Sequence, residues 1–293
     1  MQFNDLLHGQ EIDPESVLVL RHRPHEPVLR RVLPWLAAEK PDVFNAYQQT
    51  QGPKLEKVMQ SLVGSGHVAS FVGEDAGSAL FVGLYAIRGT RELTFEQCCQ
   101  IPAYAAMKSY GTQELQKRPE RKRQWFDLAL TPFYEQWHGK LIVTWPPPER
   151  SWWRRAHRNT ISISAILKES ALRPEMPDWR DIVLTWNELR VLPSSWKAAL
   201  AHWRGIYYIV DSTDGKGYVG SAYGDDNLLG RWMNYADRGH GGNIQLRSRN
   251  PEKFRFSILE RLSPDMESAD VIRREASWKQ RLGTRIPTGL NEN

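Results

Sequence analysis

Apolar and polar positions in the C-terminal third of the chain follow patterns that predict strands and helices. Residues 205–220 place two apolar, β-branched and aromatic runs on either side of a polar loop at 214–217, a pattern typical of a β-hairpin. Residues 254–262 alternate like a third strand, and residues 269–282 have the apolar spacing of a helix that ends at Gly283.

The N-terminal part carries both kinds of periodicity, which predicts a mixed α/β domain. Helical spacing is found at residues 26–39, 41–51 and 55–63, and strand patterns are found at 68–72, 79–87, 141–145 and 161–167. After a proline-rich start, residues 173–203 place Trp and Leu at helical spacing, which predicts a helical linker packed on the C-terminal part. The predicted organisation is therefore 1–172, 173–203 and 204–293.

Composition narrows the class of protein. A chain of 293 residues is long enough for two cored domains, and a net charge of +5 fits a polyanionic partner. The two cysteines, Cys98 and Cys99, are adjacent and form neither a structural disulfide nor a zinc set, which favours a cytoplasmic location. No apolar run approaches the roughly 18 residues of a membrane span, and the first residues have no signal-peptide character.

Two clusters in the N-terminal part combine positive charge with aromatic planes. We predict that the basic run at 117–123 contacts the DNA backbone, and that the tryptophans near 152 stack on bases or wall a pocket for a base turned out of the duplex. The alternative is a solvated basic face with one tryptophan in the core and one over an edge. The histidines of 21–25 are predicted to be exposed loop residues rather than metal ligands. The candidate DNA-binding residues are Lys117, Arg118, Arg121, Lys122, Arg123, Trp152, Trp153, Arg154, Arg155 and Arg158.

The C-terminal part resembles the GIY-YIG nuclease family. The first triplet is Gly205-Ile206-Tyr207 and the second is Tyr218-Val219-Gly220; further family positions follow in order at Arg231, Tyr235, Glu275 and Asn291. Arg231 and Tyr235 are four residues apart and share a helical face. The resemblance covers residues 204–293 and implies a three-stranded antiparallel sheet flanked by helices, so that the chain as a whole is predicted to be α+β.

The resemblance implies hydrolysis of a phosphodiester. Glu275 is the expected ligand of a single Mg²⁺ ion, for which Mn²⁺ can substitute, and Arg231 is expected on the non-bridging phosphate oxygens. Tyr207 and Tyr218 are candidates for orienting or deprotonating the attacking water; we assign them jointly, with a slight preference for Tyr207. The remaining family positions, Tyr235 and Asn291, are expected to position these groups or a phosphate oxygen.

One position departs from the family pattern. Some members carry a lysine directly after the second triplet, where this chain has Ser221, and His240 in a glycine-rich loop is a candidate for part of that role. Ser221 and Asn243 are candidate DNA contacts. Taken alone, His240 reads more readily as a loop residue, and Glu275 as a surface carboxylate paired with Lys279.

These features together predict a Mg²⁺-dependent DNA endonuclease, of the restriction type used in phage defence, whose N-terminal domain loosely resembles PUA-like or EVE-like readers of modified bases. The predicted partner is duplex DNA, with modified cytosine as a candidate feature, cut by a homodimer or by two successive nicks. The alternatives are a repair, recombination or homing nuclease, an inactive DNA-binding module, and a structured RNA substrate. Homing enzymes usually place the catalytic domain first, which counts against that alternative.

Overall fold

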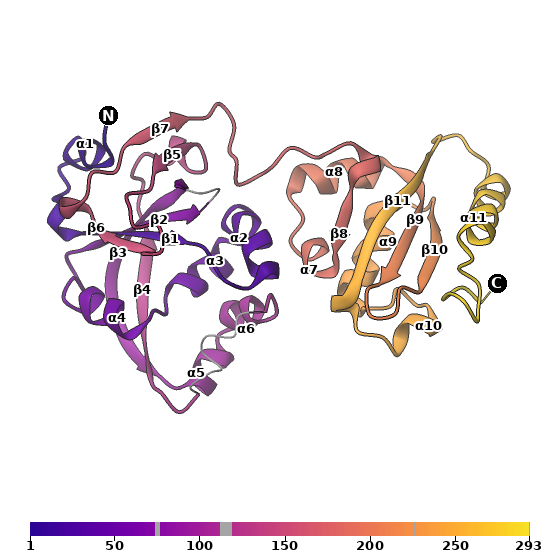
Figure 1. The fold of residues 1–293 in the computed structure, drawn as a ribbon, viewed down its shortest axis with the longest axis horizontal. Helices are drawn as coiled ribbons and strands as arrows, with labels where there is room; N and C mark the ends of the chain where they lie inside the picture. Colours follow the sequence, from indigo (N-terminus) through magenta and orange to yellow (C-terminus); the bar gives the residue numbers. More distant parts are fainter. Residues whose placement is uncertain (74–76, 112–118, 226, 293) are drawn as a thin grey trace. The chain divides into compact units, whose positions relative to one another are not determined.

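The computed structural model of the chain describes residues 1–73, 77–111, 119–225 and 227–292. The chain divides into two compact units, Met1–Pro174 and Glu175–Asn293 (Figure 1). Residues 175–203 therefore belong to the second unit. Within the described ranges, no helix combines the length and the apolar character that crossing a membrane requires.

The N-terminal unit is built on a seven-stranded mixed sheet with the order β6-β1-β2-β3-β5-β7, in which β4 also pairs with β3. The pairing of β1 with β2 is parallel and the other pairings are antiparallel. The strands are β1 (Val17–His22), β2 (His67–Gly73), β3 (Ser78–Leu93), β4 (Arg123–Leu130), β5 (Leu141–Thr144), β6 (Trp153–Arg155) and β7 (Ile163–Ile166). This arrangement confirms the mixed α/β class predicted for this part of the chain.

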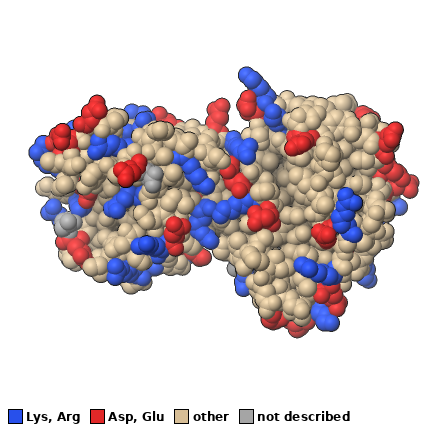
Figure 2. Space-filling view, turned by 180° about the vertical axis from the view of Figure 1, so that it is seen from behind, with Lys and Arg blue, Asp and Glu red and all other residues tan. Residues whose placement is uncertain are grey.

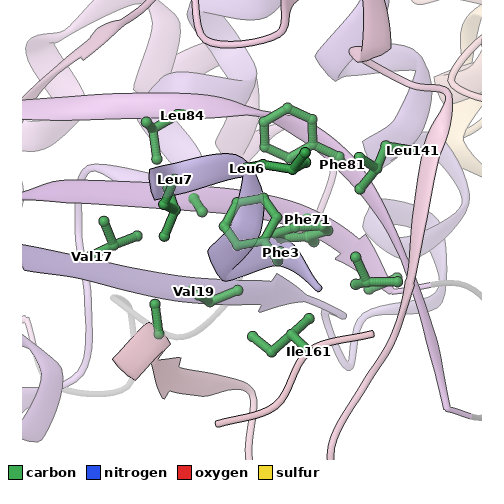
Figure 3. Packing of buried hydrophobic residues seen from close by; sticks show 14 of the residues in the cluster. Phe3, Leu6, Leu7, Val17, Val19, Phe71, Phe81, Leu84, Leu141 and Ile161 are labelled. Atoms are coloured by element: carbon green, nitrogen blue, oxygen red, sulfur yellow. The ribbon is translucent and has the colours of Figure 1, made fainter. Parts of the chain in front are cut away.

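Helices cover this sheet and close its core. Helix α1 lays Phe3, Leu6 and Leu7 on the strands, and the Phe3 ring meets the Phe71 ring edge-on at 5.4 Å between centroids (Figure 3). Burial of such side chains is the main favourable term in folding. The helices are α1 (Phe3–His8), α2 (Pro27–Glu39), α3 (Pro41–Gln48), α4 (Pro53–Gln60), α5 (Phe95–Gln100) and α6 (Pro102–Lys108), with 3₁₀ turns at Pro14–Ser16, Glu135–Trp137 and Ala156–Arg158.

Strand β1 is buried along its whole length, although the sequence patterns did not predict it. It lies between β2 and β6, so its last residues, Arg21 and His22, sit inside the unit. The prediction that His22 is an exposed loop residue is therefore wrong. The reason is tertiary: strands with neighbours on both sides and covered faces lack the alternation of a half-exposed strand.

The C-terminal unit contains a four-stranded antiparallel sheet with the order β10-β9-β11-β8. Three strands match the predicted ones: β9 (Arg204–Asp211), β10 (Gly217–Ala222) and β11 (Phe254–Leu262). The fourth, β8 (Val183–Thr185), comes from the segment predicted as purely helical and pairs with β11 through Leu184 and Phe256. Such a short strand is defined by its partner rather than by its own sequence.

Helices of the C-terminal unit hold the hairpin of β9 and β10. Helix α9 lies against β9 and β10, and helix α11 lies against β10 and β9. The helices are α7 (Trp186–Leu189), α8 (Ser194–His202), α9 (Asn227–Arg238), α10 (Ile244–Arg247) and α11 (Ser268–Leu282), with 3₁₀ turns at Trp179–Asp181 and Pro251–Lys253. In the strand order, β9 is internal and β10 lies at one end of the sheet.

Candidate active site at the β9–β10 hairpin

Three phenols meet on one face of the hairpin. Tyr207 on β9 is fully buried, its ring centroid lies 6.4 Å from that of Tyr218, and its hydroxyl oxygen lies 3.2 Å from that of Tyr235. The register places Tyr207 opposite Gly220, and a Cβ atom at position 220 would collide with the Tyr207 phenol. The glycine of the second triplet is therefore required because the first triplet's tyrosine lies across it.

Helix α9 brings Arg231 to the same phenols. Tyr235 is buried and Arg231, one turn earlier, is exposed, yet Arg231 is a hydrogen-bonding and electrostatic neighbour of Tyr207. The contact with Tyr207 raises the pKa of Arg231, against the effect of its partial burial. The guanidinium therefore stays charged, with part of its surface open to a phosphate.

Burial separates the two tyrosines that the sequence assigned jointly as candidate bases. Removal from water raises the pKa of Tyr207, the neighbouring Tyr218 adds to this effect, and Arg231 and the Tyr235 hydrogen bond only oppose it. Tyr207 is thus a poor base at neutral pH, which argues against our slight preference for it. Tyr218 on β10 is half-exposed, so its hydroxyl can reach water. The structure favours Tyr218 for contact with the nucleophile.

Glu275 on α11 forms a second group with Ser221 and Lys279. One oxygen of the Glu275 carboxylate, Oε2, accepts a hydrogen bond from the Ser221 hydroxyl. The other, Oε1, lies 2.7 Å from Nζ of Lys279, whose side chain is 8% exposed. The ion pair that the sequence offered as an alternative interpretation is therefore present, and it lies beside the position where the family lysine is missing. We did not propose Lys279 as a functional residue, although its i+4 spacing from Glu275 was the available signal.

The two groups lie on either side of the edge strand β10. Successive residues of a strand point to opposite faces, so Ser221 faces away from the side on which Tyr207 crosses Gly220. On the Ser221 side, Ile206 and Val219 pack with Val271 of α11. A ligand phosphate at the edge of β10 could therefore contact both groups.

The residues of the second group suit one hard divalent cation. Among the described residues no group of three or more His, Cys, Asp and Glu side chains could hold a metal ion. Mg²⁺ does not need such a cage, because it keeps several waters and takes a single carboxylate together with phosphate oxygens. Glu275 is partly exposed and carries a cation, the Lys279 ammonium, on Oε1 already. Its carboxylate therefore already pairs with positive charge, and Mg²⁺ there would have to displace the Lys279 ammonium.

Asn291 acts on the backbone of β10. Its side-chain oxygen accepts from the Val219 amide at 2.9 Å, and its side-chain nitrogen donates to the Val219 carbonyl at 2.8 Å. The Leu290 amide donates to the carbonyl of Gly217 on the same strand at 2.9 Å. The expectation that Asn291 positions Arg231, the metal ligand or a phosphate oxygen directly is not supported by these contacts: this side chain fixes the strand that carries Tyr218 and Ser221.

The loop with His240 lies over the tyrosine cluster. Gly241 has a positive φ of 52°, and a Cβ atom there would lie 2.7 Å from the Tyr235 ring, so the loop passes directly over that ring. Nδ1 of His240 accepts from the Gly242 amide at 3.0 Å. Asn243 caps α10 by accepting from the Leu246 amide at 3.1 Å. Both predicted residues thus have structural roles and lie at the border of the tyrosine cluster.

The basic run of the N-terminal unit is only partly available to a ligand. Lys117 and Arg118 lie outside the described residues. Arg121 forms an ion pair with Glu56, and Lys122 lies 3.1 Å from Glu92. Arg123 is buried, and together with Arg121 it lines a cavity.

One part of the tryptophan cluster lines that cavity, and another part stabilises the fold. Trp152 lines the cavity, so the structure brings it together with Arg121 and Arg123 from the other cluster. Arg154 is buried and donates to the carbonyls of Trp153, Pro146 and Pro148, which argues against a phosphate contact for it. The remaining candidates lie outside the cavity wall: Trp153 and Arg155 are half-buried on β6, and Arg158 is exposed and donates to His157.

Comparison with known proteins identifies the family of the C-terminal unit. Residues 204–291 match the model of the GIY-YIG catalytic domain. The solved catalytic domain of homing endonuclease I-TevI is 31% identical in sequence, with 31% of this chain and 98% of that chain covered and a TM-score of 0.26. A mutant of the catalytic domain of intron endonuclease I-TevI is 28% identical, with 31% of this chain and 94% of that chain covered and a TM-score of 0.26. No curated protein matches the chain significantly.

Proposed function

Through residues 204–291 the chain belongs to the GIY-YIG family of nucleases, and from this premise we propose that it is a Mg²⁺-dependent DNA endonuclease. The observation that carries the proposal is the placement of Arg231, Tyr218 and Glu275 around β10. An exposed guanidinium, a half-exposed phenol and a partly exposed carboxylate border this strand. Phosphodiester hydrolysis needs groups of these types for charge neutralisation, for water and for a cation.

Each of these residues has a role that its surroundings support. Arg231 binds the non-bridging oxygens of the phosphate, because its fork is charged and partly exposed. Tyr218 orients the attacking water, and Tyr207 and Tyr235 hold Arg231 and each other in place. Glu275 holds the divalent cation, which when bound supplies charge to the reacting phosphate and lowers the pKa of water. Asn291 keeps β10 in register.

Lys279 supplies the ammonium group that some family members place directly after the second triplet. Ser221 stands at that position, and both side chains contact the Glu275 carboxylate. If Glu275 held a divalent cation, the Lys279 ammonium would be displaced from the carboxylate and would pair with the substrate phosphate. This chain therefore provides the same charge from one turn along α11 rather than from β10.

The N-terminal unit is proposed to read duplex DNA, with modified cytosine as the recognised feature, in a restriction-type defence enzyme. Lys and Arg side chains alternate with Asp and Glu on the face shown in Figure 2 and do not gather into one continuous stripe there. The support for recognition in the N-terminal unit comes instead from its cavity, which arginines and Trp152 line. Since one GIY-YIG domain cuts one strand at a time, duplex cleavage requires a transient homodimer or two nicks.

Cleavage of matched DNA substrates tests the proposal. Wild type, Glu275→Gln and the matched control Glu267→Gln are incubated with Mg²⁺ and unmodified, methylated, hydroxymethylated or glucosylated phage DNA. Glu267 is an exposed carboxylate at the start of the same helix and is outside the site. We expect wild type and Glu267→Gln to cut and Glu275→Gln to lose cleavage. Full cleavage by Glu275→Gln would refute the assignment.

The same experiment separates the finer alternatives. Cutting of modified substrates alone supports modification-dependent restriction, and equal cutting of all substrates removes the modified-base part. A rate that rises with protein concentration beyond saturation of the DNA supports a homodimer. DNA binding without cleavage supports an inactive binding module. Cleavage of structured RNA alone would show that the substrate is RNA rather than DNA.

A further inference from the structure

A cavity of about 740 Å³ opens in the N-terminal unit, and its lining residues include none of the nuclease residues described above. Its wall comes from the end of β1, the loop before α2, the start of α4, the start of β4 and the loop before β6. Segments this distant in sequence converge only in the folded unit. A cavity of this volume is of the size that holds drug-sized organic ligands.

Positive charge dominates the wall. Six arginines and two glutamates line the cavity. Arg23 and Arg150 are exposed at its rim, whereas Arg123 is buried in its wall. Gly52 and Pro53 at the N-terminus of α4 add the positive end of a helix dipole. An anionic group such as phosphate, whose oxygens match the fork of an arginine, is therefore favoured there.

Aromatic and polar groups complete the cavity. Trp152 is 38% exposed although it is a large apolar side chain, and Tyr47 is half-buried. His22 is only 3% exposed, and its Nε2 atom has no hydrogen-bond partner among the described residues. The ring of His22 is held edge-on against Tyr47 at 5.3 Å and is hydrogen-bonded to the Gln48 side chain. The ring of His22 therefore forms part of the cavity wall, and one of its buried polar atoms is left unpaired among the described residues.

We propose that this cavity binds a nucleotide, with its base against Trp152 and Tyr47 and its phosphate on the arginines of the rim. Stacking planes and guanidinium forks together are the chemistry that nucleotides require. The nucleotide comes from one of two sources, a residue turned out of a DNA strand or a free nucleotide. The DNA source deepens the reading role proposed above, but binding at this cavity does not depend on nuclease activity.

Binding by the full-length protein in EDTA tests the proposal without cleavage. Deoxycytidine monophosphate, its 5-methyl form and deoxyadenosine monophosphate are titrated calorimetrically, beside deoxycytidine and inorganic phosphate. We expect at least one nucleotide to bind roughly ten-fold or more tightly than the nucleoside or phosphate alone. If inorganic phosphate and the nucleotides bound with equal affinity, the assignment of Trp152 and Tyr47 to base stacking would be refuted.

Variants at the rim locate the binding. Trp152→Ala should weaken nucleotide binding roughly ten-fold, whereas the neighbouring Trp153→Ala, outside the cavity wall, should not. Arg150→Ala should weaken it by a similar factor, with the exposed Arg158→Ala as its control. Equal affinity of wild type and Trp152→Ala would refute the proposal.

A duplex carrying 2-aminopurine directly beside a mismatched cytosine distinguishes the two sources, because the probe loses a stacking neighbour when the cytosine leaves the duplex. Emission that rises with wild type but not with Trp152→Ala identifies a nucleotide of DNA turned into the cavity. Nucleotide binding without this rise identifies a free nucleotide as the ligand. Absence of both nucleotide binding and the emission rise overturns the proposal, and it leaves the Glu275-dependent cleavage test unaffected.

Discussion

Acid should destabilise the N-terminal unit through His22. Burial lowers the pKa of His22 from 6.5 to about 4, and the Gln48 hydrogen bond only partly opposes this effect. Between these two values the unfolded chain binds a proton that the folded unit excludes, so stability falls as the pH falls. Taken at those values, lowering the pH from 7 to 4.5 costs roughly 2 kcal/mol through this side chain, and little further loss occurs below pH 4.

Hydrogen–deuterium exchange of the β1 and β2 amide groups measures this loss for the N-terminal unit alone. The comparison is between wild type and His22→Gln at pH 7 and pH 4.5, corrected for intrinsic exchange rates. Burial also lowers the pKa values of His67 and His138, but these residues are unchanged in both proteins and cancel. The variant should lose roughly 2 kcal/mol less than wild type over this pH interval. Equal losses would show that His22 is not held neutral, and would refute the reasoning.

Three further predictions concern the C-terminal unit. Tyr218→Phe should reduce the single-turnover cleavage rate by roughly 10²–10⁴-fold, whereas Tyr207→Phe, which removes a buried phenol with a raised pKa, should reduce it less; the reverse order would restore Tyr207 as the base. Lys279→Met should tighten Mn²⁺ binding at Glu275, measured by water proton relaxation, because it removes the cation on Oε1; unchanged affinity would rule out competition. Asn291→Ala should lower the free energy of unfolding by roughly 2–4 kcal/mol, because it leaves two buried polar groups of β10 unpaired; a urea midpoint equal to that of wild type would contradict this.

Local sequence patterns determined the elements that carry the nuclease residues. The hairpin of β9 and β10, helix α9 with its i+4 pair and helix α11 with Glu275 were predictable because their signals lie within a few residues. The position of Gly220 in the second triplet was also predictable from local sequence, because the register of a tight hairpin sets which residue lies opposite this glycine. The resemblance to a nuclease family rests on this local information and is confirmed by the family match.

Tertiary structure decided the environment of each of these residues. Sequence spacing did not distinguish Tyr207 from Tyr218, because only packing with Tyr235 and α9 removes Tyr207 from water. The role of Asn291 depends on Val219, which lies 72 positions earlier in the chain. Such contacts join distant segments, and the hydrophobic pattern of one segment contains no information about its contact with the other.

The cavity of the N-terminal unit shows the same division. The sequence by itself determined that arginines and tryptophans are present in two clusters, and it identified Trp152, Arg121 and Arg123 among them. Only the folded sheet joins these residues with His22 in one wall, and turns Arg154 inward to backbone carbonyls instead. Periodicity records which face of an element is apolar, whereas burial and pKa depend on neighbours from distant segments, which assemble only when the chain folds.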